Sequence, residues 1–162
     1  MGGPARDGSK MKKFAIRQID YEEAACFCAK THRHLPIAPP KMQCRVNYGV
    51  FWKDTLRAIA IVGNPVSPHL QKHYLEVRRL ASDGIYGACS ALYMQSDKYA
   101  ESVGKFLVTY TFANESGASL IASGASIVKT CKRGKDTRAG RKNITSNIDK
   151  VRWEWPETLT HV

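Results

Sequence analysis

The chain has 162 residues, of which 43% are apolar and 24% are charged, a composition typical of a folded domain rather than of a disordered or fibrous protein. No apolar run of about 18 residues is present, and residues 1–12 lack the apolar centre of a secretory signal, so we expect a cytoplasmic protein with no membrane partner. The 25 Lys and Arg residues outnumber the 14 Asp and Glu residues and give a net charge of +11, which favours a polyanionic partner such as nucleic acid.

The length predicts one domain over residues 13–162, preceded by a disordered tail at 1–12. The five cysteines include no Cys-x-x-Cys pair, so neither a disulfide framework nor a zinc ribbon is expected.

The first half of the chain predicts a strand at 14–19, a helix at 21–31, and a hairpin of 43–52 with 56–62. Asp20 and Glu23 form a capping-box-like pattern at the start of the helix. Three prolines predict a loop over 35–40, because proline has no amide donor.

The second half predicts a strand at 74–80, a loop at 81–87, a helix at 88–103, a strand at 105–112, a short helix at 118–123 and a last strand at 125–130. The strand at 105–112 is almost entirely β-branched or aromatic and should be central in the sheet. Residues 129–142 hold seven Lys or Arg, so 129–150 is predicted to be a basic loop or insertion.

A strand that leads through a glycine-containing loop into a helix is a general anion cradle, because the amides of the first helical turn lack partners inside the helix. Here Gly84 and Gly87 precede the predicted helix at 88–103. The spacing alone fits a tight turn as well as a phosphate site.

The layout resembles the GNAT superfamily of acyltransferases, whose Arg/Gln-x-x-Gly-x-Gly/Ala loop after the fourth strand binds the pyrophosphate of coenzyme A. Cys89 departs from this pattern, because it stands where glycine or alanine is usual. The resemblance implies an α/β (α+β) fold, in which one mixed central sheet is flanked by helices and its strands splay at the cofactor site. It also implies acetyl-CoA or another acyl-CoA as donor. The cofactor-binding residues that it implies in and before the loop are Arg78, Arg79, Leu80, Gly84, Gly87, Ala88, Cys89 and Ser90. Residues 114–124 are similar to a second signature of the superfamily, an Asn followed by a short helix, which adds Asn114 and Ser116.

Several spaced motifs between residues 32 and 128 are similar to the phage Mom-like branch of this superfamily. They are His32-Arg-His34, Val62-Gly-Asn-Pro-Val66, Leu75-Glu-Val-Arg-Arg-Leu80, Asp83-Gly84, Ala88-Cys-Ser-x-Leu-Tyr93, Thr109-Tyr-Thr111 and Glu115-Ser-Gly-x-Ser-Leu120. This resemblance implies modification of adenine at its exocyclic nitrogen in phage DNA, which protects the genome from restriction.

Acyl transfer to an amine needs a base for the amine and a proton donor for the departing thiolate. Glu76 is the candidate base, and the alternative is a surface carboxylate paired with Arg78 or Lys72. Tyr110 is the candidate acid, and the alternative is a core tyrosine with a satisfied hydroxyl. Asp83 is assigned to the site from the motif match.

His32 and His34 are assigned to contact substrate or act as a base. A metal site formed by these histidines with Glu76 or Glu115 is a further alternative, although no metal is expected.

The basic stretch lies outside this resemblance, but its charge suits the phosphate backbone of a DNA substrate. The residues expected to line that backbone are Lys129, Lys132, Arg133, Lys135, Arg138, Arg141 and Lys142. For each of them a solvated loop is the alternative. An ordinary N-acetyltransferase acting on a small amine, a protein lysine or an aminated pyrimidine remains a competing function, as does a nucleic-acid-binding module without activity. A homodimer also stays open.

Overall fold

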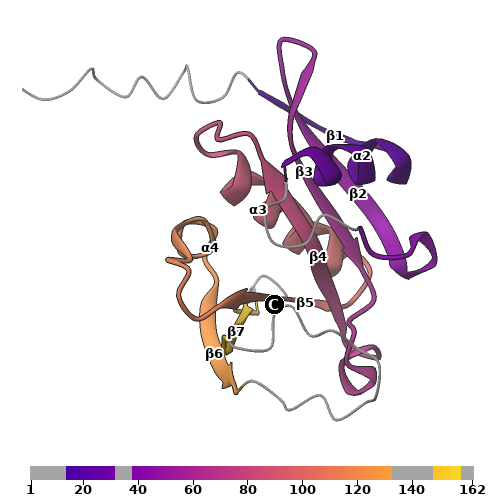
Figure 1. The fold of residues 1–162 in the computed structure, drawn as a ribbon. Helices are drawn as coiled ribbons and strands as arrows, with labels where there is room; N and C mark the ends of the chain where they lie inside the picture. Colours follow the sequence, from indigo (N-terminus) through magenta and orange to yellow (C-terminus); the bar gives the residue numbers. More distant parts are fainter. Residues whose placement is uncertain (1–13, 32–37, 133–147, 158–162) are drawn as a thin grey trace, which may run out of the picture.

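The computed structural model describes residues 14–31, 38–132 and 148–157. These residues form one seven-stranded mixed sheet with helices on both faces (Figure 1). The elements in chain order are β1 (Ala15–Gln18), α2 (Tyr21–Thr31), η1 (Lys41–Gln43), β2 (Cys44–Trp52), β3 (Thr55–Gly63), η2 (Pro68–Leu70), β4 (Tyr74–Ser82), α3 (Ala88–Ser102), β5 (Phe106–Phe112), α4 (Ala118–Ala122), β6 (Ser126–Cys131) and β7 (Lys150–Glu154).

The strands lie in the order β1-β2-β3-β4-β5-β7-β6. The first four form an antiparallel meander, α3 is the crossover to the parallel strand β5, and β7 lies antiparallel between β5 and β6. Backbone pairing between β4 and β5 ends at Glu76 and Val108, although both strands continue. Beyond this point the two strands diverge, and the sheet opens like a V (Figure 1).

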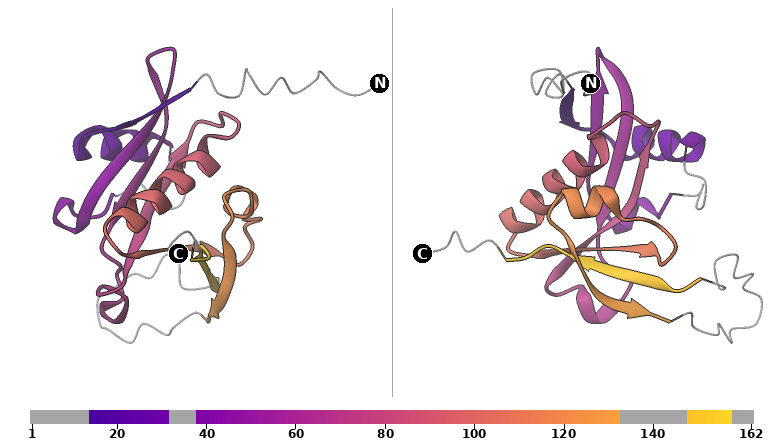
Figure 2. Two further views of the ribbon diagram at one scale, coloured as in Figure 1. Left: turned by 180° about the vertical axis from the view of Figure 1, so that it is seen from behind. Right: turned by 90° about the vertical axis from the view of Figure 1, so that its left-hand side faces the viewer.

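The two faces of the sheet are covered by different helices, as the right-hand view of Figure 2 shows. Apolar side chains of β3 contribute to the core on both faces of the sheet, because successive side chains of a strand point to opposite sides. Val62 packs in the core under α3, together with Leu75 and Leu92, whereas Ile59 and Ile61 pack under α2. Burial of each such side chain contributes roughly 1.5–3 kcal/mol.

Several local predictions are confirmed. The helix predicted at 21–31 is α2, and the side chain of Asp20 accepts a hydrogen bond from the amide of Glu23 at 2.8 Å. The predicted hairpin closes through Lys53 and Asp54, whose φ angles of 49° and 64° suit a two-residue turn. The predicted α/β architecture with strands splayed on one side is the observed one.

Three predictions are wrong. Strand β4 extends to Ser82 because Ala81 and Ser82 pair with β3, so the loop covers 83–87 rather than 81–87. The strand after α4 is not the last one, because β7 follows it and enters the sheet interior. The helix predicted at 88–103 ends at Ser102, because Val103 is its C-cap and is exposed.

Among the helices in the described part of the chain, none is long and apolar enough to cross a membrane.

Candidate functional site

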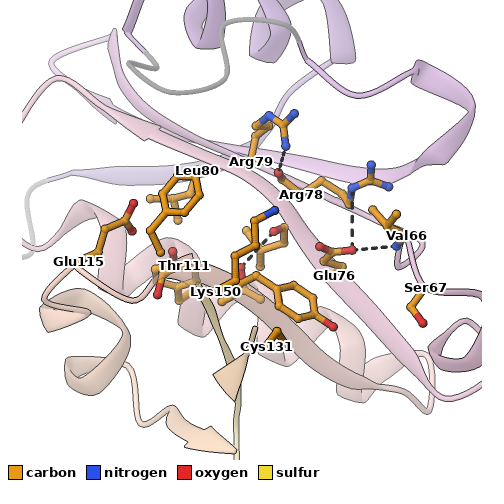
Figure 3. Close-up of a pocket in the computed structure, with 15 residues that line it drawn as sticks. Val66, Ser67, Glu76, Arg78, Arg79, Leu80, Thr111, Glu115, Cys131 and Lys150 are labelled. Atoms are coloured by element: carbon orange, nitrogen blue, oxygen red, sulfur yellow. Dashed lines mark hydrogen bonds and ion pairs between the residues drawn. The ribbon is translucent and has the colours of Figure 1, made fainter. Parts of the chain in front are cut away.

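A cavity of about 580 Å³ lies where β4 and β5 separate (Figure 3). We call it the V cavity. Its walls come from the β3–β4 connection, β4, α3, β5 and the segment after it, β6 and β7. The lining residues that carry ionisable or hydroxyl groups are Ser67, Glu76, Arg78, Arg79, Tyr93, Thr109, Tyr110, Thr111, Glu115, Cys131 and Lys150.

Glu76 lies at the apex of the V, where the last backbone pair joins β4 to β5. Only 7% of the residue is exposed, so Glu76 is not a surface carboxylate, although it does form the ion pair with Arg78 that this alternative named. Its Oε2 accepts a hydrogen bond from the amide of Val66 at 3.0 Å. Burial raises the pKa of Glu76, and the Val66 hydrogen bond and the charges of Arg78, Arg79 and Lys150 partly offset the rise. A carboxylate with a raised pKa is a suitable proton acceptor near neutral pH.

A bulge in β4 places Arg78 beside this carboxylate. The register with β3 shifts so that Val77 and Arg79 pair with successive β3 residues, which leaves Arg78 as the extra one. The Arg78 guanidinium donates from Nη1 to Gln43 Oε1 and to the Asn64 carbonyl, both at 3.0 Å, and its Nε lies 3.9 Å from Glu76 Oε2. Arg78 therefore links Glu76 to the β3–β4 connection.

Tyr110 on β5 lines the V cavity from the opposite side. Burial raises the pKa of its hydroxyl, the nearby Arg152 lowers it, and the charges of Glu76 and Cys131 raise it further. The hydroxyl therefore stays protonated near neutral pH and can donate a hydrogen bond or a proton.

Lys150 was missed in the sequence because its strand, β7, was not predicted. It is paired with Cys131 across the β6–β7 ladder, and both side chains line the V cavity. Figure 3 shows Lys150 extending from its strand into the middle of the cavity, toward β4. The alternation of charged and apolar residues over 150–154 was the available signal, since Val151 and Trp153 are buried.

A second cavity, of about 820 Å³, lies beside the loop that follows β4, and we call it the loop cavity. Its lining residues are Thr31, Leu80, Ala81, Ser82, Asp83, Gly84, Cys89, Tyr93, Thr111, Glu115, Ser116, Gly117, Ala118, Ser119 and Leu120. Gly84 and Gly87 have φ angles of 102° and 80°, a region that L side chains rarely adopt, and a Cβ at Gly84 would have nothing within 4 Å. The loop thus leaves open space in front of the first turn of α3.

The V cavity and the loop cavity share four lining residues, namely Leu80, Tyr93, Thr111 and Glu115. Tyr93 is only 7% exposed, and burial raises the pKa of its hydroxyl well above the usual range. Its ring packs on Trp155 with the centroids 5.7 Å apart. A neutral hydroxyl therefore stands at the junction of the two cavities. Tyr93 belongs to the motif at 88–93, but no role was predicted for this tyrosine.

The residues predicted for the cofactor divide between the two cavities. Gly84, Cys89 and Ser116 line the loop cavity, whereas Arg78 and Arg79 line the V cavity. Leu80 lines both. Gly87 is the N-cap of α3, whose first residues, Ala88 and Ser90, are buried and half-buried, while Asn114 lies exposed in the turn after β5 and lines neither cavity.

Asp83 lines the loop cavity and forms an ion pair with Arg57. The structure therefore does not bring it together with Glu76 and Tyr110, which line the other cavity. His32 and His34 lie outside the described residues. Within the described ranges, no group of three or more His, Cys, Asp or Glu side chains is arranged to hold a metal ion.

Of the residues predicted to contact DNA, Lys129 on β6 and Lys132 just after it are exposed. The other five, Arg133, Lys135, Arg138, Arg141 and Lys142, lie outside the described residues. The buried aromatic residues Trp153 and Trp155 belong to the core and are not accessible for stacking on a base.

Solved structures of several acetyltransferases have a similar architecture. An acetyltransferase from Bacillus subtilis in complex with CoA has a TM-score of 0.62 at 13% identity, over 88% of this chain and 98% of that one. An N-acetyltransferase from Staphylococcus aureus Mu50 has a TM-score of 0.63 at 12% identity, over 87% and 96%. A GNAT family acetyltransferase from Elizabethkingia anophelis with acetyl-CoA bound has a TM-score of 0.61 at 12% identity, over 89% and 98%.

No protein-family model and no curated protein sequence matches the chain. The structural likeness shows that the chain has the fold of the GNAT acetyltransferases, as the sequence resemblance predicted.

Proposed function

We propose that the chain is an acyl-CoA-dependent N-acyltransferase whose acceptor is the exocyclic amino group of adenine in DNA. The observation that carries the transferase proposal is the meeting of two cavities where β4 and β5 separate, with a buried carboxylate at the apex. The CoA and acetyl-CoA bound in structures of the same fold support an acyl-CoA donor.

The loop cavity fits the diphosphate of such a donor. Gly84 leaves room for phosphate oxygens, and the first turn of α3 presents amides that have no partner inside the helix. From there an extended arm has a direct route past Tyr93 into the V cavity, because the cavities share lining residues. Bound there, acyl-CoA would supply a thioester carbonyl for attack by the amine and a thiolate as leaving group.

Two residues of the V cavity then take the proton-transfer roles. Glu76 accepts a proton from the attacking amine on its carboxylate, and its raised pKa suits that task. The hydroxyl of Tyr110 donates a proton to the departing sulfur, because it remains protonated near neutral pH. The nitrogen loses one proton, the sulfur gains one, and the acyl group changes partner, so the transfer balances.

The choice of DNA as the acceptor rests on observations other than the cavities. It is supported by the net charge of +11, by the exposed Lys129 and Lys132 next to β7, and by the motif resemblance to the Mom-like proteins. Modification of adenine in phage DNA would protect that DNA from restriction. An adenine must leave the base stack to reach the V cavity, as in other enzymes that act on bases.

The second candidate is an ordinary N-acetyltransferase that acts on a small amine, a protein lysine or an aminated pyrimidine. It is favoured by the structural neighbours, one of which is nourseothricin acetyltransferase.

Mass spectrometry of nucleosides from cells that express the wild-type protein or the Glu76→Gln variant separates these candidates. A new adenine adduct that requires Glu76 is expected. Unmodified DNA together with acetylated amines would support the second candidate, and the absence of CoA binding by the purified protein would reject both.

A further inference from the structure

The donor's negatively charged diphosphate is assigned to the loop cavity, but the basic side chains line the V cavity instead. The described lining of the loop cavity, which we assign to the donor's diphosphate, contains the acidic residues Asp83 and Glu115 and neither Lys nor Arg. The V cavity, which would receive only the uncharged acyl end, is lined by Arg78, Arg79 and Lys150. The positive charge of the V cavity is therefore not explained by the donor.

The acidic residues of the V cavity do not balance these three cations. Glu115 lies at the junction with the loop cavity, and Glu76 forms an ion pair with Arg78. Arg78 donates to the neutral oxygens of Gln43 and Asn64, and Glu76 is 3.9 Å from its Nε. Three cationic side chains against two acidic ones leave an excess of positive charge in the described lining, which favours an anionic group.

Lys150 is the residue placed to meet that group. No carboxylate of the described chain lies within ion-pair distance of its ammonium, which instead lies 5.9 Å from the centroid of the Phe112 ring. The side chain extends into the middle of the cavity from β7, between Glu76 at one end and Glu115 at the other (Figure 3). A ligand anion bound there would have its amine within the same cavity as the base.

We infer that the acceptor carries an anionic group, a phosphate or a carboxylate, close to the amine that is acylated, and that Lys150 binds this group within the V cavity. The inference rests on the proposed function, because it assigns the donor's phosphates to the loop cavity. In a DNA acceptor the anion is a backbone phosphate next to the modified base, and in a small acceptor it is a phosphate or carboxylate on the amine itself.

Binding to the CoA-saturated protein, measured by calorimetry, tests the inference without turnover. The ligands are matched pairs with and without the anion: deoxyadenosine 5′-monophosphate against deoxyadenosine, O-phosphoethanolamine against ethanolamine, and β-alanine against propylamine. We expect the anionic member of at least one pair to bind roughly tenfold more tightly, the range of a charge-assisted hydrogen bond. The pair with the largest ratio identifies the source of the anion.

Three variants test whether Lys150 causes the preference for the anionic ligand. Lys150→Gln should remove the preference, and Lys150→Arg should keep it because the charge remains. Lys98→Gln is the matched control, since it removes one exposed lysine from α3 without touching either cavity.

Equal affinity for both members of every pair would overturn the inference, as would an unchanged preference in Lys150→Gln. If the wild-type protein binds no CoA, the proposed function fails. In that case the same pairs measured on the free protein still decide whether Lys150 is an anion site.

Discussion

The hydroxyl of Thr109 on β5 donates a hydrogen bond to the Val77 carbonyl on β4 at 3.1 Å, one residue beyond the last backbone pair of the two strands. Thr109 is 3% exposed, so water does not compete for this bond. A side chain thus replaces the backbone ladder at the point where the V opens.

Removing the Thr109 hydroxyl should therefore lower the free energy of unfolding. Thr109→Val keeps the shape but leaves the Val77 carbonyl buried without its donor, and we expect a loss of about 1 kcal/mol or more in the free energy of unfolding. Thr109→Ser, which keeps the donor, should lose less. Urea denaturation of the three proteins measures this order, and equal stability of the Val variant and wild type would show that the bond contributes nothing.

Removing the charge of Arg78 should move the pH dependence of transfer. The groups that act on Glu76 are the Val66 amide, Arg78, Arg79 and Lys150, and the nearby arginine charges lower its pKa against the larger effect of burial. In Arg78→Gln the pKa of Glu76 therefore rises further, and the acidic limb of the rate profile shifts to higher pH.

The matched control is Arg45→Gln, because Arg45 donates to the side chain of the same Asn64 but makes no contact with Glu76. Its profile should coincide with that of the wild type. A coincident profile for Arg78→Gln would remove Arg78 from the positioning of the base.

Glu76→Gln should abolish transfer and stabilise the fold at neutral pH. The folded-state pKa of Glu76 is raised, so its contribution to stability is present below the unfolded pKa and is lost as the pH rises through the folded pKa. The difference in unfolding free energy between variant and wild type should therefore grow with pH, by about 1.4 kcal/mol for each unit of pKa shift. Thermal denaturation at several pH values measures it, and a constant difference would contradict the raised pKa.

Tyr110→Phe should slow acyl transfer while leaving CoA binding intact. Loss of a positioned proton donor typically costs 10²- to 10⁴-fold in rate. Single-turnover kinetics with saturating donor isolate this step, and wild-type rates in the variant would exclude Tyr110 from the mechanism.

Gly117→Ala should destabilise the wall of the loop cavity more than Gly84→Ala does. Both glycines have positive φ, which costs about 1–2 kcal/mol for alanine. A Cβ at Gly117 would also lie 2.4 Å from Cζ2 of the buried Trp153, whereas one at Gly84 meets nothing within 4 Å. Urea denaturation measures the difference, because Gly84→Ala has backbone strain alone and Gly117→Ala has backbone strain and a steric overlap with Trp153.

Local patterns were sufficient for most of the fold. The α2 helix, the β2–β3 hairpin and α3 are recognisable because capping, turn and periodicity signals lie within each segment. Strand β7 could not be placed in the same way, since its neighbours, β5 and β6, are far away in sequence. Its absence from the prediction also hid Lys150, which reaches the V cavity only through that pairing.

The candidate site was predictable where a motif marked it. Glu76 and Tyr110 were named from the sequence, and both line the V cavity. The bulge at Arg78 carries no sequence signal, so the two arginines were assigned to the phosphate loop instead of the cavity wall. Tyr93 was quoted only as part of a motif, because helical periodicity does not reveal which buried residue stands between two cavities.

During synthesis, the β1–β4 meander can form early, since each strand pairs with a neighbour in sequence. The other half of the sheet must wait for β7, because Glu154 pairs with both Val108 and Ser126. The nascent chain therefore carries Glu76 on a folded half before Lys150 exists to face it. The V cavity is therefore complete only after β7 has been synthesised.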